Sequence, residues 1–220
     1  MRKEDKRKDD CMYYPIATTI RQKNVVIIGG GVIATQKLRT LQGYGAYVTV
    51  VAPTLTDEGK ELVHMLHGIW HAKPFEQDDV RDAFIVFVAT NDKAVNEAVS
   101  AAVQPNQLIL RADDVSQGNM LNQAVVRRGS LSIAVCTDGA SPSLTRKLKR
   151  QFEEQFPADY DVYVQFLAEA RRHILAHVPR EKSRALLNKL IDEELEQLIA
   201  ARDEEKAWAI VDKWVAASNT

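Results

Sequence analysis

Residues 24–34 have the sequence NVVIIGGGVIA, which is the strongest indication of fold class in the chain. Residues 24–28 form a nearly continuous apolar run, which is typical of a strand covered on both faces of a parallel sheet. Three glycines follow, and a helical pattern then runs from about Val32 to Gln42. Glycines at such a turn let the backbone approach a diphosphate, which free N–H groups and the helix dipole can hold. The stretch therefore predicts a dinucleotide-binding turn.

The glycine spacing agrees with this interpretation. Gly29, Gly31 and Ala34 match the pattern G-x-G-x-x-G/A, with Ala34 as the small residue where the helix meets the strand. The pattern is weak alone and gains weight from the strand before it and the helix after it. A bulky residue at Gly30 or Gly31 should abolish cofactor binding and leave the fold intact. The alternative is a glycine-rich turn without a ligand.

Strands and helices alternate along the first half of the chain. Further strands are expected at 47–51, 69–72, 84–89 and 107–110, with helical stretches between them up to about residue 67 and at 93–103. Repetition of strand, helix and strand at this spacing predicts right-handed crossovers and a parallel sheet. The expected fold class is α/β, with a Rossmann-type parallel-sheet domain over residues 13–114.

The pattern changes after Asp114. Residues 120–126 and 131–135 read as two strands of a hairpin, joined across residues 127–130. From Ser141, a good N-cap, only helical periodicity remains. Prolines at 157 and 179 and the charged stretch near residue 202 divide the rest into about four helices. We expect a small β-containing segment at 115–150 and a helical C-terminal domain at 151–220.

Composition and charge narrow the class of protein. The formal net charge is −1, which argues against a general nucleic-acid or membrane-surface binder. The two cysteines, Cys11 and Cys136, form neither a disulfide framework nor a zinc pattern. The start of the chain has no signal-peptide pattern, and no apolar run reaches the ~18 residues of a membrane span. We expect a cytoplasmic protein with a disordered tail at residues 1–12.

Three segments together carry a family resemblance. They are the glycine loop, the run 88–92 with Val95 and Asn96, and the stretch from VVRRG at 125–129 to GASP at 139–142. In this order they resemble the siroheme-synthase dehydrogenase family, which comprises precorrin-2 dehydrogenases with or without sirohydrochlorin ferrochelatase activity. The resemblance covers about residues 13–150. It implies NAD-dependent oxidation of precorrin-2 to sirohydrochlorin, and a homodimer whose interface is the segment 115–150.

The cofactor expected at the glycine loop is NAD. The second strand ends at Ala52 and Pro53, and the first acid after it is Asp57. No Arg or Lys lies in that turn to receive a 2′-phosphate, which favours NAD over NADP. The expected cofactor-binding residues are Gly29, Gly30, Gly31, Val32, Ile33, Ala52, Pro53, Thr90 and Asn91.

The tetrapyrrole substrate implied by the resemblance is a polycarboxylate, so its site needs cations. The run RKLKR at 146–150 places four positive charges within about a turn and a half of helix, and two arginines lie in the preceding hairpin. The alternative is a solvated basic helix face. The expected substrate-binding residues are Arg127, Arg128, Thr137, Ser141, Arg146 and Lys149.

The resemblance also implies a catalytic Asp after the fifth strand. Ungapped counting from Gly118 and Asn119 places Asp113 there, with Asp114 beside it. We expect Asp113 to act as the base or to position the macrocycle, and mutual repulsion is expected to raise one of the two pKa values. The alternative is an exposed Asp pair that caps a turn.

Other features bear on the competing functions. Where the family commonly has Asn, Pro, an aromatic residue and Pro, this chain has Leu110, Val115, Met120 and Gln123. These departures, and Asp138, which resembles the branch that only dehydrogenates, argue against iron insertion. A bifunctional dehydrogenase and ferrochelatase, or a non-catalytic NAD-sensing module, are the alternatives.

His173 and His177 have metal-ligand spacing without a matched carboxylate, so no metal site is expected. Cys136 is expected in a buried strand as inert core.

Overall fold

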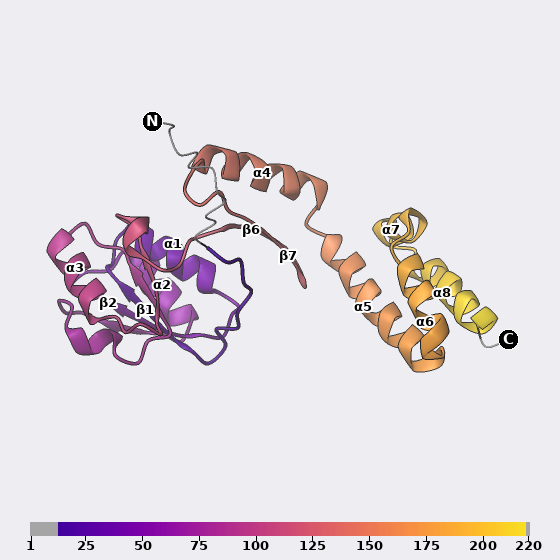
Figure 1. Cartoon of the computed structure of the whole chain (residues 1–220), viewed down its shortest axis with the longest axis horizontal. Helices are drawn as coiled ribbons and strands as arrows, with labels where there is room; N and C mark the ends of the chain where they lie inside the picture. Colours follow the sequence, from indigo (N-terminus) through magenta and orange to yellow (C-terminus); the bar gives the residue numbers. More distant parts are fainter. Residues whose placement is uncertain (1–12, 219–220) are drawn as a thin grey trace, which may run out of the picture. The chain divides into compact units, whose positions relative to one another are not determined.

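The computed structural model of the chain describes residues 13–218, so the tail expected at residues 1–12 lies outside the described residues. The chain divides into two compact units, one that ends at Asn122 and one that begins at Gln123 (Figure 1). The first unit contains a parallel sheet with helices on both faces. In its described part, residues 123–218, the second unit contains a hairpin and five helices.

The first unit is a Rossmann-type α/β domain, as predicted. Its five strands are all parallel and lie in the order β3-β2-β1-β4-β5. The elements are β1 (Asn24–Ile28), α1 (Val32–Leu41), β2 (Tyr47–Val51), α2 (Asp57–Met65), β3 (Ile69–His71), η1 (Gln77–Val80), β4 (Ile85–Val88), α3 (Lys93–Ala102), β5 (Leu108–Arg111) and η2 (Val115–Gln117). The strand β5 extends one residue beyond its predicted end, to Arg111.

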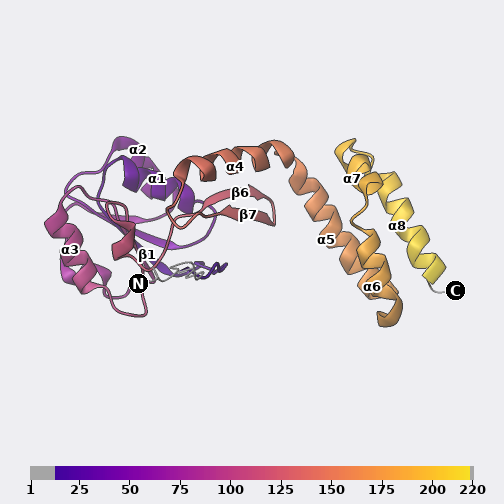
Figure 2. The same ribbon diagram turned by 45° about the horizontal axis from the view of Figure 1, so that its top comes forward.

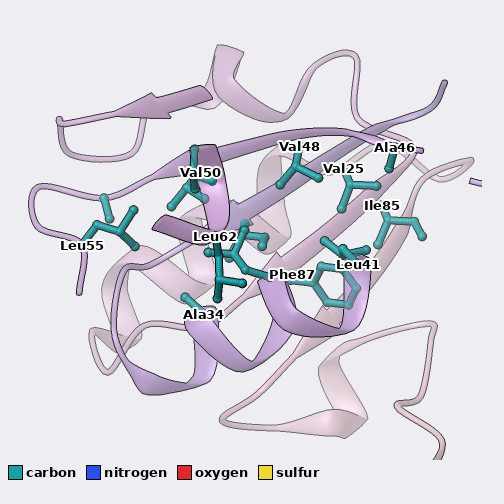
Figure 3. Packing of buried hydrophobic residues seen from close by; sticks show 14 of the residues in the cluster. Val25, Ala34, Leu41, Ala46, Val48, Val50, Leu55, Leu62, Ile85 and Phe87 are labelled. Carbon is teal, nitrogen blue, oxygen red and sulfur yellow. The ribbon is translucent and has the colours of Figure 1, made fainter. Parts of the chain in front are cut away.

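The apolar run of β1 is explained by burial on both faces of the sheet. Val25 and Ile27 pack with α1 and α2 in one cluster, part of which Figure 3 shows. Val26 and Ile28 pack with α3 and η1 in a second cluster on the opposite face. A strand whose successive side chains point to opposite faces must be apolar at every position when both faces are covered.

The strand order creates a crevice at the carboxyl edge of the sheet. From β1 the chain moves outward to β2 and β3, and it then returns to the other side of β1 to form β4 and β5. The loops after β1 and β4 therefore leave neighbouring strands in opposite directions. Ligands of open α/β sheets bind at this switch point, outside the carboxyl ends of the strands.

The segment after β5 belongs to the first unit, beyond the boundary predicted at residue 114. The side chain of Asn119 accepts a hydrogen bond from the backbone N–H of Ile109 (2.8 Å) and donates one to the carbonyl oxygen of Gln107 (2.8 Å). A Cβ on Gly118 would lie 2.7 Å from the carbonyl oxygen of Ile109, which shows how closely this segment follows β5. These contacts satisfy backbone groups of an edge strand. The segment expected at 115–150 is therefore shared between the two units.

The hairpin of the second unit is shifted from its predicted position. Its strands are β6 (Ala124–Arg128) and β7 (Leu131–Val135), which are antiparallel. The turn contains only Gly129 and Ser130, and Gly129 has the positive φ, +56°, that such tight turns require. The two arginines expected in the turn therefore lie in β6. The first residues of the predicted strand fall outside β6 because Met120 packs against the core of the first unit.

The helices of the second unit number five in the described residues, one more than predicted. They are α4 (Pro142–Gln155), α5 (Tyr160–His177), α6 (Arg180–Lys189), α7 (Glu193–Ala200) and α8 (Glu204–Ser218). The extra break follows Lys189, where the side chain of Asp192 caps α7 by accepting from the N–H of Glu194 (2.8 Å). Helices α5 to α8 are neighbours in Figure 2, and they share one apolar core. Helix α4 buries no residue fully.

Cys136 is exposed, so the prediction of a buried core cysteine is wrong. Strand alternation explains the difference. Val135 is the last residue of β7 and points inward, with 9% of its surface exposed, and the next side chain points outward as the strand ends.

Candidate functional site

The three glycines after β1 have different surroundings. Gly29 has φ +117°, and a Cβ on it would lie 2.3 Å from the carbonyl oxygen of Ala89. A Cβ on Gly30 would lie 1.9 Å from the carbonyl oxygen of Thr54. No atom lies within 4 Å of the Cβ position of Gly31. The first two glycines are thus packed against backbone and the third is open. The close contact at Gly30 argues against the prediction that its replacement leaves the fold intact. For Gly31 the same statement stays a prediction.

The open glycine begins α1. Gly31 is the N-cap of this helix, and no side chain caps it. Because the first N–H groups of an α-helix have no partner within the helix, they can donate hydrogen bonds to an anion here. Val32 and Ile33, in the first turn, are 69% and 41% exposed. This cradle fits the diphosphate of a nicotinamide dinucleotide, which when bound supplies a ring that accepts hydride.

The turn after β2 lies against the glycine loop. The N–H of Thr56 donates to the carbonyl oxygen of Gly30 (3.1 Å). Ala52 is buried, and its carbonyl oxygen accepts a hydrogen bond from Nε1 of Trp70 (2.9 Å). Pro53, which follows, is exposed. Backbone and apolar atoms therefore form this part of the crevice.

The loop after β4 holds Thr90 and Asn91. The hydroxyl of Thr90 donates to Oδ1 of Asn96 (2.6 Å), and Nδ2 of Asn96 donates to the carbonyl oxygen of Thr90 (3.2 Å). Asn96 lies on α3 and is 1% exposed. The loop is thereby attached to the first turns of α3, and Ala89 at its start contacts the Cβ position of Gly29. The glycine loop and this loop are adjacent at the switch point of the sheet.

Asp113 lies two residues beyond β5 and pairs with Arg111 through both carboxylate oxygens. Nε of Arg111 donates to Oδ1 (3.1 Å) and Nη2 donates to Oδ2 (2.7 Å). Nη1 donates to Oε1 of Glu97 on α3 (2.8 Å). The side chain of Arg111 is 3% exposed and that of Asp113 is 25% exposed. Sequence reasoning missed Arg111, although a cation at the end of an apolar strand was a signal that it had a partner.

The pairing determines the charge of Asp113. The Arg111 guanidinium holds the pKa of the Asp113 carboxyl well below its usual range, and a hydrogen bond from Asn96 acts in the same direction. The pKa of Asp114 is also lowered, chiefly by hydrogen bonds from Ser116. The prediction that repulsion raises one of the two pKa values is therefore wrong, because hydrogen-bond donors outweigh the neighbouring charge. Asp114 caps η2, with Oδ1 accepting from the N–H of Ser116 (3.0 Å).

In the second unit, Arg128 stabilises the end of α4. Its Nε donates to the carbonyl oxygens of Phe156 and Pro157 (2.7 Å each), and Nη2 donates to that of Glu153 (3.3 Å). Carbonyl groups at a helix C-terminus lack partners within the helix and attract a cation. Nε of Arg127, on the same strand, donates to Oγ of Ser132 (3.4 Å).

The other expected substrate residues lie at the start and along α4. Ser141 caps the helix, with Oγ accepting from the N–H of Leu144 (3.3 Å). The hydroxyl of Thr137 accepts from the N–H of Ser141 (3.1 Å). Arg146 is exposed, and Lys149 makes only a long ion pair with Glu153 (3.6 Å). These cations are available to an anionic ligand.

The histidines on α5 have protein partners. Nε2 of His173 lies 3.0 Å from Oδ1 of Asp212 on α8, and Nδ1 of His177 lies 2.8 Å from the carbonyl oxygen of His173. Residues 13–218 contain no group of three or more His, Cys, Asp or Glu side chains that could hold a metal ion. Among the same residues, no helix is long and apolar enough to cross a membrane.

Known families match two parts of the chain. Residues 16–124 match a family described as NAD(P)-binding, and residues 128–155 match one described as sirohaem biosynthesis protein central. With the parallel sheet and the open glycine cradle, these matches define the class: an oxidoreductase of Rossmann type that uses a nicotinamide dinucleotide.

Curated relatives and a solved structure narrow the class. The precorrin-2 dehydrogenase of Priestia megaterium is 35% identical over 82% of this chain and 90% of its own length. That of Bacillus subtilis is 32% identical over 72% of this chain and 98% of its own. The siroheme synthase of Nitrosomonas eutropha is 31% identical over 78% of this chain, which corresponds to 37% of that longer protein.

The structure of SirC, a precorrin-2 dehydrogenase, is 32% identical with a TM-score of 0.78, and the match covers 91% of this chain and 100% of that one. The chain belongs to the family of precorrin-2 dehydrogenases and siroheme synthases. The resemblance inferred from the motifs is confirmed.

Proposed function

We propose that this enzyme oxidises precorrin-2 to sirohydrochlorin with NAD as hydride acceptor. The observation that carries the proposal is the carboxyl edge of one sheet, where the cradle open at Gly31 and the anion of Asp113 both lie. The relatives that support it are precorrin-2 dehydrogenases matched over 90% and 98% of their length. The expected cofactor residues keep their proposed roles, with Gly31, Val32 and Ile33 at the diphosphate. The cytoplasmic location stays a prediction.

The turn after β2 favours NAD over NADP. The turn offers neither an acid for the ribose nor a cation for a 2′-phosphate before Asp57. The first cation beyond it, Lys60, forms an ion pair with Asp57 at 2.7 Å. A 2′-phosphate would enter this turn without a cation to compensate its charge, whereas a ribose hydroxyl needs none. We expect kcat/KM with NAD to exceed that with NADP by about tenfold or more.

Asp113 serves this reaction as a fixed anion. Dehydrogenation takes two hydrogens from the substrate, one as a hydride and one as a proton. A carboxylate whose pKa lies far below neutrality takes up a proton only weakly, so it is a poor general base. It remains a strong hydrogen-bond acceptor for the N–H groups of a tetrapyrrole. Of the two roles predicted from the sequence, positioning of the macrocycle is therefore the one we favour.

Cations on α4 bind the carboxylates of the substrate. Arg146 is exposed and Lys149 is held only by a long contact to Glu153. Arg127 extends from β6 on the same unit, and Thr137 and Ser141 shape the turn that precedes α4. Arg128 contributes to this site by fixing the C-terminus of α4 rather than by meeting the substrate, because its guanidinium is engaged with carbonyl groups.

The enzyme acts as a homodimer through the hairpin and α4. A two-stranded sheet is marginally stable alone, and both edges of this one lack a further strand within the described residues. Val125 on β6 is 39% exposed and Leu144 on α4 is 45% exposed. Pairing with a second copy through an isologous interface would cover these apolar residues.

An anaerobic assay tests the proposal. The purified chain is incubated with precorrin-2 and NAD, and the sirohydrochlorin absorption spectrum is followed together with NADH. Turnover that needs both reactants supports the proposal. Binding of NAD without turnover would instead identify an NAD-sensing module. Asp113→Ala should lower kcat by about 10²-fold with NAD affinity nearly unchanged, whereas Asp114→Ala, which removes only the cap of η2, should have a small effect.

A further inference from the structure

Arg111 is the most deeply buried cation in the described part of the first unit. The residue is 2% exposed, although it stands at the end of an edge strand. Burial of a guanidinium costs free energy unless its N–H groups are satisfied by acceptors. Here every nitrogen has one: Nε and Nη2 bond Asp113, while Nη1 bonds Glu97 and, at 3.3 Å, Oγ of Ser100. The residue therefore connects β5, α3 and the segment that carries Asp113.

The geometry of this pairing restricts Asp113. Two parallel N–H···O bonds from one planar guanidinium hold a carboxylate in one plane, which a single bond cannot do. Arg111 itself is anchored on α3 through Glu97, and Asn96 on the same helix bonds Thr90 in the loop after β4. Thus the group that aligns the carboxylate is held by the same helix that attaches the cofactor loop. A quarter of the Asp113 side chain remains exposed and can meet a ligand.

We infer that Arg111 is a positioning residue for the oxidation, which fixes the orientation of the Asp113 carboxylate for the tetrapyrrole. The inference rests on the proposed function, since it gives Asp113 its role in turnover. It adds a residue that acts only through Asp113 and that does not touch the substrate. The charged groups around the pair are Glu97 on α3 and Asp114 next in sequence, and both are acids. Without Arg111, their charges would favour protonation of Asp113.

The test combines kinetics with a direct titration. Arg111→Met removes the donors at similar side-chain length, and Arg111→Lys keeps the charge but cannot bond both oxygens in parallel. We expect Arg111→Met to lower kcat by about 10- to 100-fold with the KM for NAD unchanged, and Arg111→Lys to recover part of the loss. In the Met variant an acidic limb should emerge in the pH profile near or above the ordinary aspartate pKa of about 4. Wild type should lack that limb.

A double-mutant cycle separates positioning from a merely structural role. If Arg111 acts through Asp113, then Asp113→Asn should reduce kcat strongly in wild type and only slightly in the Arg111→Met background. Additive losses would overturn the inference. Asp114→Asn is the matched control, because its carboxylate has no hydrogen bond from Arg111.

Titration of the wild-type protein needs no variant to fold. Carboxyl ¹³C resonances of Asp113 should stay at the ionised position down to the lowest pH at which the protein remains folded. A midpoint near 4 would overturn the inference even if the Met variant did not fold. If Asp113→Asn left kcat unchanged while the titration behaved as expected, the pairing would stand and the proposed role of Asp113 in turnover would fail.

Discussion

Replacement of Gly31 separates cofactor binding from folding more cleanly than any other change in the glycine loop. A Cβ at Gly31 would meet no protein atom within 4 Å, and the backbone there, with φ −86° and ψ −164°, is extended backbone that residues other than glycine adopt. We therefore expect Gly31→Ala and Gly31→Val to change the unfolding free energy without cofactor by no more than about 1 kcal/mol. Their Cβ atoms occupy the space proposed for the diphosphate, so NAD affinity should fall stepwise with side-chain size.

Weaker NAD binding by the Gly31 variants should also reduce the stabilisation of the fold by NAD. If the Val variant binds NAD about 100-fold more weakly, it loses about 2.8 kcal/mol of binding free energy. NAD at about 100 times the wild-type Kd stabilises wild type by about 2.7 kcal/mol, and the same concentration would stabilise the variant by only about 0.4 kcal/mol. Calorimetric titration gives the affinities, and thermal unfolding with and without NAD gives the stabilisation.

Gly30 provides the matched comparison. A Cβ there would lie 1.9 Å from the carbonyl oxygen of Thr54, so the turn after β2 would have to move. Gly30→Ala should lower the unfolding free energy by roughly 3 kcal/mol or more even without cofactor. A Gly31→Val protein that bound NAD as tightly as wild type would refute the assignment of the diphosphate to this loop. A Gly30→Ala protein as stable as wild type would refute the packing argument.

Three further predictions follow from the ion pair and the second unit. The folded-state pKa of Asp113 is depressed, so its pairing stabilises the fold above the unfolded aspartate pKa of about 3.9 and this contribution fades as pH falls below that value. The unfolding free energies of wild type and Arg111→Met should accordingly differ by roughly 1–3 kcal/mol at pH 7 and converge in acid, as denaturant titrations at several pH values would reveal. Light scattering at micromolar concentration should give the mass of two chains for wild type. The double variant Val125→Asp with Leu144→Asp should give a mass closer to that of one chain. A monomeric wild type would contradict the proposed dimer. Iron insertion into sirohydrochlorin should not exceed the spontaneous rate, because residues near Asp113, among them Leu110 and Val115, depart from the family pattern, and clear catalysis at limiting enzyme would disprove this.

Some parts of the candidate site could be predicted because they depend on local rules. A glycine turn between an apolar strand and a helix has a backbone requirement that is visible in the residues themselves, and Gly29, with φ +117°, meets it. The cap at Ser141 is equally local, since a side chain bonds an N–H three residues away. The register of the hairpin was harder. Its turn contains only Gly129 and Ser130. The start of β6 depends on the packing of Met120 against the core of the first unit, which is a contact between residues far apart in the sequence.

The α/β class, the parallel sheet, the glycine turn and the family could be predicted because they follow from strand periodicity, glycine placement and motif order, which are properties of the sequence. The chemistry of Asp113, in contrast, depends on the tertiary structure. The neighbouring charge of Asp114 suggested that the pKa of Asp113 is raised. The pKa is instead lowered by Arg111, which lies two residues earlier, at the end of β5, and bonds the Asp113 carboxylate. The tertiary structure likewise distinguishes Gly30, where a Cβ would lie against the carbonyl oxygen of Thr54, from Gly31, where a Cβ would meet no atom within 4 Å. Charges and close contacts act through space, and their outcome depends on which segments the fold brings together.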